Sequence, residues 1–311
     1  MKLEETKKTF DHILSEMSKV IVGQQEVLKQ MLVALLTNSH AMLEGYPGLA
    51  KTLAVKTMSQ LMDLKFSRVQ NTPDLMPSDI TGTYIIEESS AGKRSFKFQP
   101  GPIFANIVLA DEINRATPKT QSALLEAMQE KQVTVGNSTF ELEQPFFVLA
   151  TQNPIEQEGT YPLPEAQTDR FLLKIKTDYP SPEEELEIVN KYCAETVSIK
   201  LKPVLNKNSL LFLQQIVRQV PIAADVKKYA VDIVTSTRNK KNLIEYGASP
   251  RASIGLVLAA KARALVEGRK FVSKVDVNTM AYPVLRHRLV LSFEAERQNM
   301  NVDDVIKTLL K

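Results

Sequence analysis

This 311-residue sequence has little cysteine and little net charge. Cys193 is the only cysteine, which excludes an intrachain disulfide and a cysteine-based zinc cluster. Lys and Arg total 39 against 36 Asp and Glu, and a formal charge of +3 is too small to predict a nucleic-acid or membrane surface by itself. No apolar run approaches membrane-spanning length. With no signal-peptide pattern either, we expect a cytoplasmic protein.

The remaining composition is that of an ordinary globular protein, with 43% hydrophobic and 24% charged residues. The chain exceeds the usual size of one domain, so we expect a large α/β unit and a smaller second domain. Five short apolar runs predict the buried strands of a parallel sheet because helices or long connections separate them. These runs are residues 41–43, 66–69, 107–110, 146–150 and 171–175.

Two stretches of alternating apolar and polar residues predict hairpins beside that sheet. In the first, residues 83–87 face 95–99, and in the second, residues 132–135 face 139–142 across Gly136-Asn137. A further helix starts at Thr117-Pro118, an N-cap followed by a proline.

Beyond Thr177 the strand signal stops, and Ser181-Pro182 with Glu184 forms a capping-box pattern that opens a helix. The remaining pattern is helical, with helices expected near residues 183–195, 208–219, 223–238, 250–267, 274–288 and 302–310. We therefore expect an α/β core in residues 1–178, with hairpins near 83–99 and 132–142. A linker of residues 179–205 and an all-α domain of residues 206–311 follow.

Residues 45–52 read Gly-Tyr-Pro-Gly-Leu-Ala-Lys-Thr and lie between a predicted strand and a predicted helix. Backbone N–H groups in such a loop converge on one point, and the helix N-terminus favours an anion. Lys51 is placed to reach the β- and γ-phosphates of a nucleotide, and the Thr52 hydroxyl to bind Mg²⁺. Ala50 departs from the GxxxxGK[ST] pattern, and the looser pattern arises by chance in roughly one chain in six. Alone, the octapeptide also fits a lysine after an ordinary turn.

Two acids end the apolar strand at residues 107–110, where strand ends and ligands meet in such sheets. Asp111 is suited to hold Mg²⁺, and Glu112 to orient and deprotonate the water that attacks the γ-phosphate. Asn153 follows another strand, where it is suited to fix that water, although Asn-Pro is also a common turn signal. Arg170 and Arg251 lie in a loop and at a helix start, where arginines are usually solvated.

In order and spacing, these segments resemble the successive signatures of MoxR-type AAA+ ATPases of the helix-2-insert group. The resemblance rests on EGYPGLAKT, LADEINRA, ATQNP and DRF, and it extends from IVGQ at residues 21–24 to SPRA at 249–252. It implies a P-loop core with a helical lid, and in that family an alanine at position 50 is normal. It also implies that Asn153 is sensor 1, Arg170 the finger that reaches a neighbour's nucleotide, and Arg251 the sensor 2 of the lid. Arg115 is a further candidate for an inter-subunit contact.

The same resemblance implies ATP and Mg²⁺ as cofactors, with Mg²⁺ held by Thr52 and Asp111 and catalysis by Lys51, Glu112, Asn153 and Arg170. The hairpins would be the helix-2 insert and the pre-sensor insert. The residues expected at the nucleotide are Val22, Gly23, Gln24, Gly45, Pro47, Gly48, Leu49, Ala50, Lys51, Thr52, Leu53 and Arg251.

As function, the resemblance implies an ATP-hydrolysing homo-oligomer, usually a hexameric ring, that remodels or matures a protein client with a von Willebrand factor A domain. A nucleic-acid motor is the alternative, since Lys93, Arg94 and Lys97 put charge on one hairpin, although no DNA-binding motif is appended. A scaffold switched by nucleotide binding alone is a third reading. A P-loop kinase fits less well because the Asp-Glu pair suits water activation.

Overall fold

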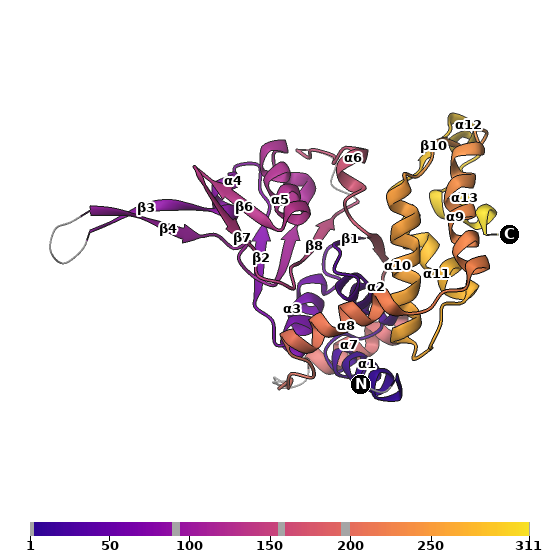
Figure 1. The fold of residues 1–311 in the computed structure, drawn as a ribbon, viewed down its shortest axis with the longest axis horizontal. Coiled ribbons are helices and arrows are strands. Elements are labelled where there is room, and N and C mark those ends of the chain that lie inside the picture. Colours follow the sequence, from indigo (N-terminus) through magenta and orange to yellow (C-terminus); the bar gives the residue numbers. More distant parts are fainter. Residues whose placement is uncertain (1–2, 89–93, 155–158, 194–199, 311) are drawn as a thin grey trace.

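The computed structural model describes residues 3–88, 94–154, 159–193 and 200–310 (Figure 1). Its centre is a five-stranded sheet in the order β2-β5-β8-β1-β9, and every neighbouring pair is parallel. The predicted five-stranded parallel sheet is therefore confirmed. The strands are β1 (Ala41–Gly45), β2 (Phe66–Gln70), β5 (Ile107–Asp111), β8 (Phe147–Gln152) and β9 (Leu173–Thr177).

The sheet is buried on both faces, which explains why its strands are continuous apolar runs. Alternate side chains of a strand enter different cores: Leu109 joins the core that α2 (Gln25–Leu36) and α3 (Lys51–Leu61) cover, whereas Val108 joins the core under α5 (Pro118–Glu130). The strands of the sheet are therefore held between two packed layers.

The C-terminal part is helical, as the sequence predicts. At the start of α7, Ser181 N donates to Glu184 Oε2 at 2.8 Å and Glu184 N to Ser181 Oγ at 3.3 Å, so the capping box is confirmed. The helices are α7 (Pro182–Cys193), α8 (Lys207–Gln219), α9 (Ala224–Asn239), α10 (Pro250–Val266), α11 (Lys274–Leu285) and α13 (Val302–Leu309). Helices α9 to α13 lie on the opposite side of the sheet from the projecting hairpin, whereas α7 and α8 lie near α1 (Leu3–Ser18), α2 and α3 (Figure 1).

Several elements carry no clear sequence signal. The N-terminal helix α1 (Leu3–Ser18) packs on α2, α3 and α10. The others are short: α4 (Pro77–Thr81), the 3-10 helix Ile113–Arg115, α6 (Glu165–Thr168), α12 (Phe293–Arg297), and the paired strands β10 (Ile244–Tyr246) and β11 (Val290–Leu291).

The C-terminal helices do not form an isolated body. Gln214 of α8 donates from Nε2 to the carbonyl oxygen of Leu35 in α2 at 2.8 Å, and one hydrophobic core includes residues of α1, α2, α3 and α8–α11. The division into a core of residues 1–178, a linker of 179–205 and a lid of 206–311 stays a prediction. Among the described residues, no helix has the length and apolar character needed to cross a membrane.

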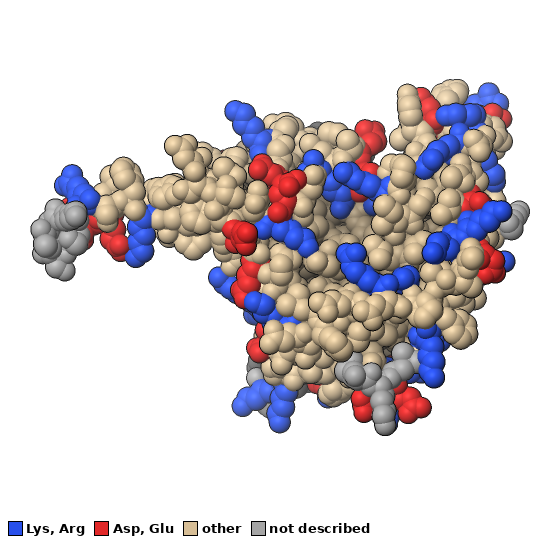
Figure 2. All heavy atoms as spheres, in the orientation of Figure 1, with Lys and Arg blue, Asp and Glu red and all other residues tan. Residues whose placement is uncertain are grey.

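Both predicted hairpins are present, as β3 (Gly82–Glu88) with β4 (Arg94–Pro100) and β6 (Gln132–Val135) with β7 (Ser138–Glu141). The β3–β4 hairpin projects far from the sheet, and it carries charged side chains of both signs (Figures 1 and 2). Its base is anchored where Phe98 stacks on Phe140 with ring centroids 4.0 Å apart. Farther out, Phe96 is 76% exposed.

His40 stands immediately before β1 and is buried. The backbone N–H of Val148 donates to His40 Nδ1 at 3.0 Å, so Nε2 carries the ring proton and donates to Met128 O at 3.0 Å. Burial lowers the pKa of His40 from 6.5 to about 4, because a charged imidazole loses its water here. Protonation would also remove the acceptor that Val148 uses.

We expect this histidine to make stability depend on pH. Its pKa is lower in the folded state, so its contribution is complete above pH 6.5 and is lost as the pH falls toward 4. At pH 5 the loss is about 2 kcal/mol of unfolding free energy. Urea denaturation at pH 7.5 and pH 5 should show a smaller loss for His40→Asn than for the wild type. Equal losses in the two proteins would contradict this assignment.

Candidate functional site

The carboxyl ends of three adjacent strands bring the sequence-predicted groups to one edge of the sheet. β8 lies between β1 and β5, and all three are parallel. Gly45 ends β1 and Asp111 ends β5, while Asn153 follows the last residue of β8. The loop at residues 45–52 and the acids therefore share one edge, although they are more than fifty residues apart in the chain.

The backbone of the loop explains both its glycines and its alanine. Gly48 has φ +81°, and a Cβ added there would meet nothing within 4 Å, so the loop is open at this point. A Cβ on Gly45 would lie 1.7 Å from Thr177 Oγ1, so only glycine fits beside β9. Ala50 has φ 52°, the left-handed conformation that the usual glycine adopts without strain. Alanine reaches the same geometry at a modest cost in backbone strain.

Lys51 and Thr52 are the first two residues of α3, so they lie at the positive end of the helix dipole. Lys51 Nζ donates to the carbonyl oxygen of Gly45 at 2.6 Å. Burial lowers the pKa of Lys51, and the charges of Asp111 and Glu112 act in the opposite direction. The two acids thus lie near enough to the ammonium group to stabilise its charge.

Asp111 is held by two groups that sequence reasoning missed. Thr151 Oγ1 donates to Asp111 Oδ1 at 2.6 Å, and Arg68 donates to Oδ2 from Nη2 at 2.6 Å and from Nε at 3.1 Å. Arg68 lies on β2, which pairs with β5 in register. The carboxylate is therefore fixed in orientation before any ligand binds.

Glu112 is turned away from its strand by a left-handed backbone, with φ 55°. Its N–H donates to Thr151 Oγ1 at 2.8 Å. Arg115 Nη1 donates to Glu112 Oε2 at 3.2 Å, and Gln70 Nε2 donates to the same oxygen at 3.4 Å. The sequence suggested Arg115 as an inter-subunit contact, and in this chain it pairs with Glu112.

Mg²⁺ fits this edge as an ion shared with a nucleotide. In the described residues, no group of three or more His, Cys, Asp and Glu side chains is arranged to hold a metal. Asp111 offers carboxylate oxygens at the strand end, and Thr52 offers a hydroxyl at the helix start. Mg²⁺ is commonly bound by one or two such protein oxygens together with phosphates and waters. Arg68 would have to share or release Asp111 Oδ2.

The segment predicted to lie near the adenine reaches the loop. Gln24 has φ 55°, and its Nε2 donates to the carbonyl oxygen of Leu49 at 3.5 Å. Gly23 has φ +66°, and a Cβ there would lie 2.5 Å from Glu184 Oε1 of α7. Val22 is buried, whereas Leu53 of α3 is 37% exposed. A nucleotide bound at the loop would therefore lie beside the left-handed backbone of Gly23 and Gln24.

Asn153 is 8% exposed and lines a hollow of about 540 Å³ with Asn114 and Glu44. Glu44 pairs with Lys174 across β1 and β9, with Oε2 and Nζ 2.5 Å apart. The side-chain oxygen of Asn114 is buried and has no hydrogen-bond partner among the described residues. Asn153 therefore lies at the same sheet edge as the acids, in a polar and partly enclosed setting.

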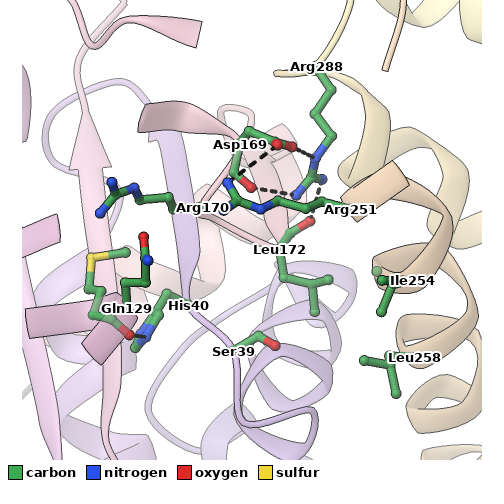
Figure 3. Close-up of a pocket in the computed structure, with 12 residues that line it drawn as sticks. Ser39, His40, Gln129, Asp169, Arg170, Leu172, Arg251, Ile254, Leu258 and Arg288 are labelled. Carbon is green, nitrogen blue, oxygen red and sulfur yellow. Dashed lines mark hydrogen bonds and ion pairs between the residues drawn. The ribbon is translucent and has the colours of Figure 1, made fainter. Parts of the chain in front are cut away.

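Arg170 and Arg251 lie at the opposite edge of the sheet from the loop, and Figure 3 shows both of them near Asp169. Leu172 N donates to His40 O at 2.8 Å, and His40 precedes β1, so Arg170 stands where the strands begin. Five strand residues, roughly 16 Å, separate this edge from the loop. Arg251 Nη1 is 3.7 Å from Asp169 Oδ2, beside Arg170. The structure thus does not bring Arg251, expected as sensor 2, to the loop of its own chain.

Comparisons with known proteins agree with this architecture. Residues 40–173 match a model of the ATPase family associated with various cellular activities, and residues 236–309 match a model of the AAA lid domain. The chain is 46% identical to the chaperone MoxR1 of Mycobacterium tuberculosis, over 97% of this chain and 81% of that protein.

It is 30% identical to the protein MoxR of Paracoccus denitrificans, over 90% of this chain and 88% of that one. A crystal structure from Cytophaga hutchinsonii, provisionally assigned as an ATPase, superposes with a TM-score of 0.91 at 42% identity, covering 99% of this chain and 95% of that chain. The chain therefore belongs to the MoxR family of AAA+ ATPases.

Proposed function

We propose that the protein hydrolyses ATP with Mg²⁺ as a closed oligomer and uses the cycle to remodel or mature a protein partner. The observation that carries the hydrolytic part is that the parallel strands β1, β8 and β5 place the loop before Lys51 and the acids Asp111 and Glu112 at one edge of the sheet. One edge then offers a cradle for phosphate, a metal ligand and a base. This is the set of groups that phosphoryl transfer to water requires.

In this proposal each side chain has one task. Lys51 and the loop N–H groups bind the β- and γ-phosphates, while Thr52 and Asp111 hold Mg²⁺, which neutralises charge on the phosphates when bound. Glu112 orients and deprotonates the attacking water, and Asn153 fixes that water from the end of β8. Arg115 and Gln70, which contact Glu112 Oε2, set the direction of its carboxylate.

The two arginines at the opposite edge act on a neighbouring subunit. Because roughly a strand length separates Arg170 from its own loop, its guanidinium is useful to a nucleotide held by another copy. Contacts that pair one edge with the other edge of a second copy are head-to-tail, and such contacts form a ring when the rotation from copy to copy closes. Arg251, which shares Asp169 with this segment, faces the same neighbour. For this class the ring is usually a hexamer.

The partner is a protein rather than a nucleic acid. A relative at 46% identity is described as a chaperone, and the resemblance points to a client with a von Willebrand factor A domain. The charges that suggested a nucleic-acid motor are balanced, since Lys97 pairs with Glu87 at 3.0 Å and Arg94 with Glu88 at 3.3 Å. Lys93 lies outside the described residues.

The proposal predicts that turnover per subunit rises with protein concentration, because isolated subunits lack the arginine of a neighbour. Steady-state hydrolysis of Mg-ATP should be measured across a dilution series alongside the oligomeric state. Lys51→Ala should abolish binding and turnover at every concentration, whereas Lys307→Ala on α13 should behave as wild type. Turnover per subunit that is constant while the oligomer dissociates would refute the shared site. Stimulation by DNA in place of protein would refute the partner class.

A further inference from the structure

Arg170 lies in a short connection between a helix and a strand. The segment Asp169–Leu172 joins the four-residue helix α6 to β9. The Arg170 side chain donates from Nη1 to the carbonyl oxygen of Leu125 at 3.0 Å, and it lines a hollow of about 260 Å³ (Figure 3). An arginine that has to reach another subunit depends on how rigidly this backbone is held.

Arg288, which follows α11, supplies that support. Its Nε donates to Asp169 Oδ1 at 2.7 Å, and its Nη2 donates to Asp169 O at 3.2 Å and Phe171 O at 2.5 Å. Its Nη1 donates to Leu172 O at 3.0 Å and also to the carbonyl oxygen of Val284 in α11. Arg288 thus donates hydrogen bonds to the residue before Arg170 and to the two residues after it.

Other groups of the C-terminal helical part hold the same segment. His287 shares the carbonyl oxygen of Phe171, with Nε2 2.9 Å away, and Ser249 Oγ donates to Asp169 Oδ2 at 2.9 Å. Ser249 is the N-cap of α10, the helix that carries Arg251. The position of the Arg170 backbone is therefore fixed by the C-terminal helices as well as by the sheet.

The cost of burying Arg288 supports a geometric role. Its side chain is 3% exposed, and burial lowers its pKa while the Asp169 carboxylate raises it. A buried ion pair contributes little net stability compared with well-packed apolar side chains. A guanidinium, unlike an apolar side chain, is a planar group whose several N–H donors can fix several acceptors at once. Here those acceptors surround Arg170.

We propose that Arg288 is a positioning residue that fixes the backbone on both sides of Arg170 and so aims the Arg170 guanidinium at the nucleotide of the neighbouring subunit. This inference rests on the proposed role of Arg170 in that neighbour's site. It makes the C-terminal helices of one subunit a determinant of turnover in the next one.

The test uses Arg288→Gln and Arg288→Lys in the full-length chain. A misplaced catalytic group typically costs roughly 10²-fold in rate, so kcat should fall by that order while KM for ATP changes little. Lysine keeps the charge opposite Asp169 but lacks the fork, so Arg288→Lys should recover little of the lost kcat. Full recovery by lysine would show that charge alone matters and would overturn the positioning role.

Arg286→Gln is the matched control. Arg286 follows α11 as Arg288 does, and it donates to Asp303 Oδ1 of α13 at 2.7 Å and to the carbonyl oxygen of Lys174 in β9 at 3.4 Å. Its partners among the described residues lie outside the segment Asp169–Leu172. Both glutamine variants should lose thermal stability, and only Arg288→Gln should lose kcat. Equal losses of kcat in the two variants would show that Arg288 is merely structural.

Mixed oligomers separate this inference from the proposed function. Arg288→Gln subunits keep their own loop and acids, so Glu112→Gln subunits, which keep their arginines, should restore turnover when the two are mixed. Arg170→Ala mixed with Glu112→Gln is the reference. If the reference mixture recovers and the Arg288→Gln mixture does not, Arg288 does not aim Arg170. If the reference mixture fails, Arg170 does not act on a neighbour.

Discussion

Glu112→Gln should bind Mg-ATP with unchanged affinity and lose turnover by roughly 10²–10⁴-fold, the usual contribution of a general base. The amide has nearly the shape of the carboxylate but no basic oxygen, so it cannot accept the proton of the attacking water. Asp111 is a separate group held by Arg68 and Thr151, so the metal site should survive the substitution. Calorimetric titration with ATP and steady-state hydrolysis measure the two quantities independently.

A suitable control for this substitution is Glu294→Gln. Glu294 lies in the first turn of α12, is exposed, and is far along the chain from the acids. The Glu294→Gln variant undergoes the same chemical change, from carboxylate to amide, as Glu112→Gln. Its turnover should equal that of the wild type. Turnover within a few fold of wild type in Glu112→Gln would remove Glu112 from the role of base.

Arg170→Ala should lower turnover by roughly 10³–10⁵-fold, the range that arginines supplied by a neighbour contribute in comparable enzymes. The guanidinium stabilises charge that develops on the γ-phosphoryl oxygens, so its loss should affect kcat far more than the affinity for ATP. The variant has to be assayed at a concentration where size measurements show that rings still form. Arg297→Ala, an exposed arginine of α12, is the control for loss of charge.

If Arg170→Ala retains full turnover in assembled rings, the arginine does not complete a neighbour's site. If the variant fails to assemble, Arg170→Lys, which keeps a positive charge at the interface, supplies the comparison. The Arg170→Lys variant should assemble, and its turnover should remain slow, because the point charge of lysine cannot replace the planar guanidinium.

Much of the proposed nucleotide edge was predictable because local patterns position it. The apolar runs at residues 41–43 and 107–110 predict parallel strands, and parallel strands place their carboxyl ends together. The spacing of Lys51 and Thr52 after the loop then fixes their place at the helix start. What the pattern left open was Ala50, whose left-handed backbone in the structure explains how an alanine substitutes for the usual glycine.

The groups that hold the acids were not predictable from the sequence. Arg68 and Gln70 approach Asp111 and Glu112 only because β2 pairs with β5 in a particular register. No local spacing encodes that register, since the two strands are separated by a hairpin and a short helix. Thr151 was within a noted motif, but its contact with Asp111 depends on the order of the strands.

The placement of Arg251 was likewise beyond sequence reasoning. The Ser249-Pro250 signal correctly predicts where α10 begins, and Ser249 Oγ accepts a hydrogen bond from Arg251 N at 3.2 Å. Which sheet edge that helix end meets depends on how the C-terminal helices pack on the sheet. Arg288 shows the same dependence, because it contacts Asp169 across 119 residues of sequence.

The central claim is that the loop before Lys51 and the acids Asp111 and Glu112 face each other across a magnesium-bound triphosphate. A crystal structure of the protein with Mg²⁺ and a slowly hydrolysed ATP analogue tests it most directly. The account predicts the β- and γ-phosphates on Lys51 and the loop amides, with Mg²⁺ between Thr52 and Asp111 and a water beside Glu112. A triphosphate bound elsewhere, or acids that point away from it, would contradict the account.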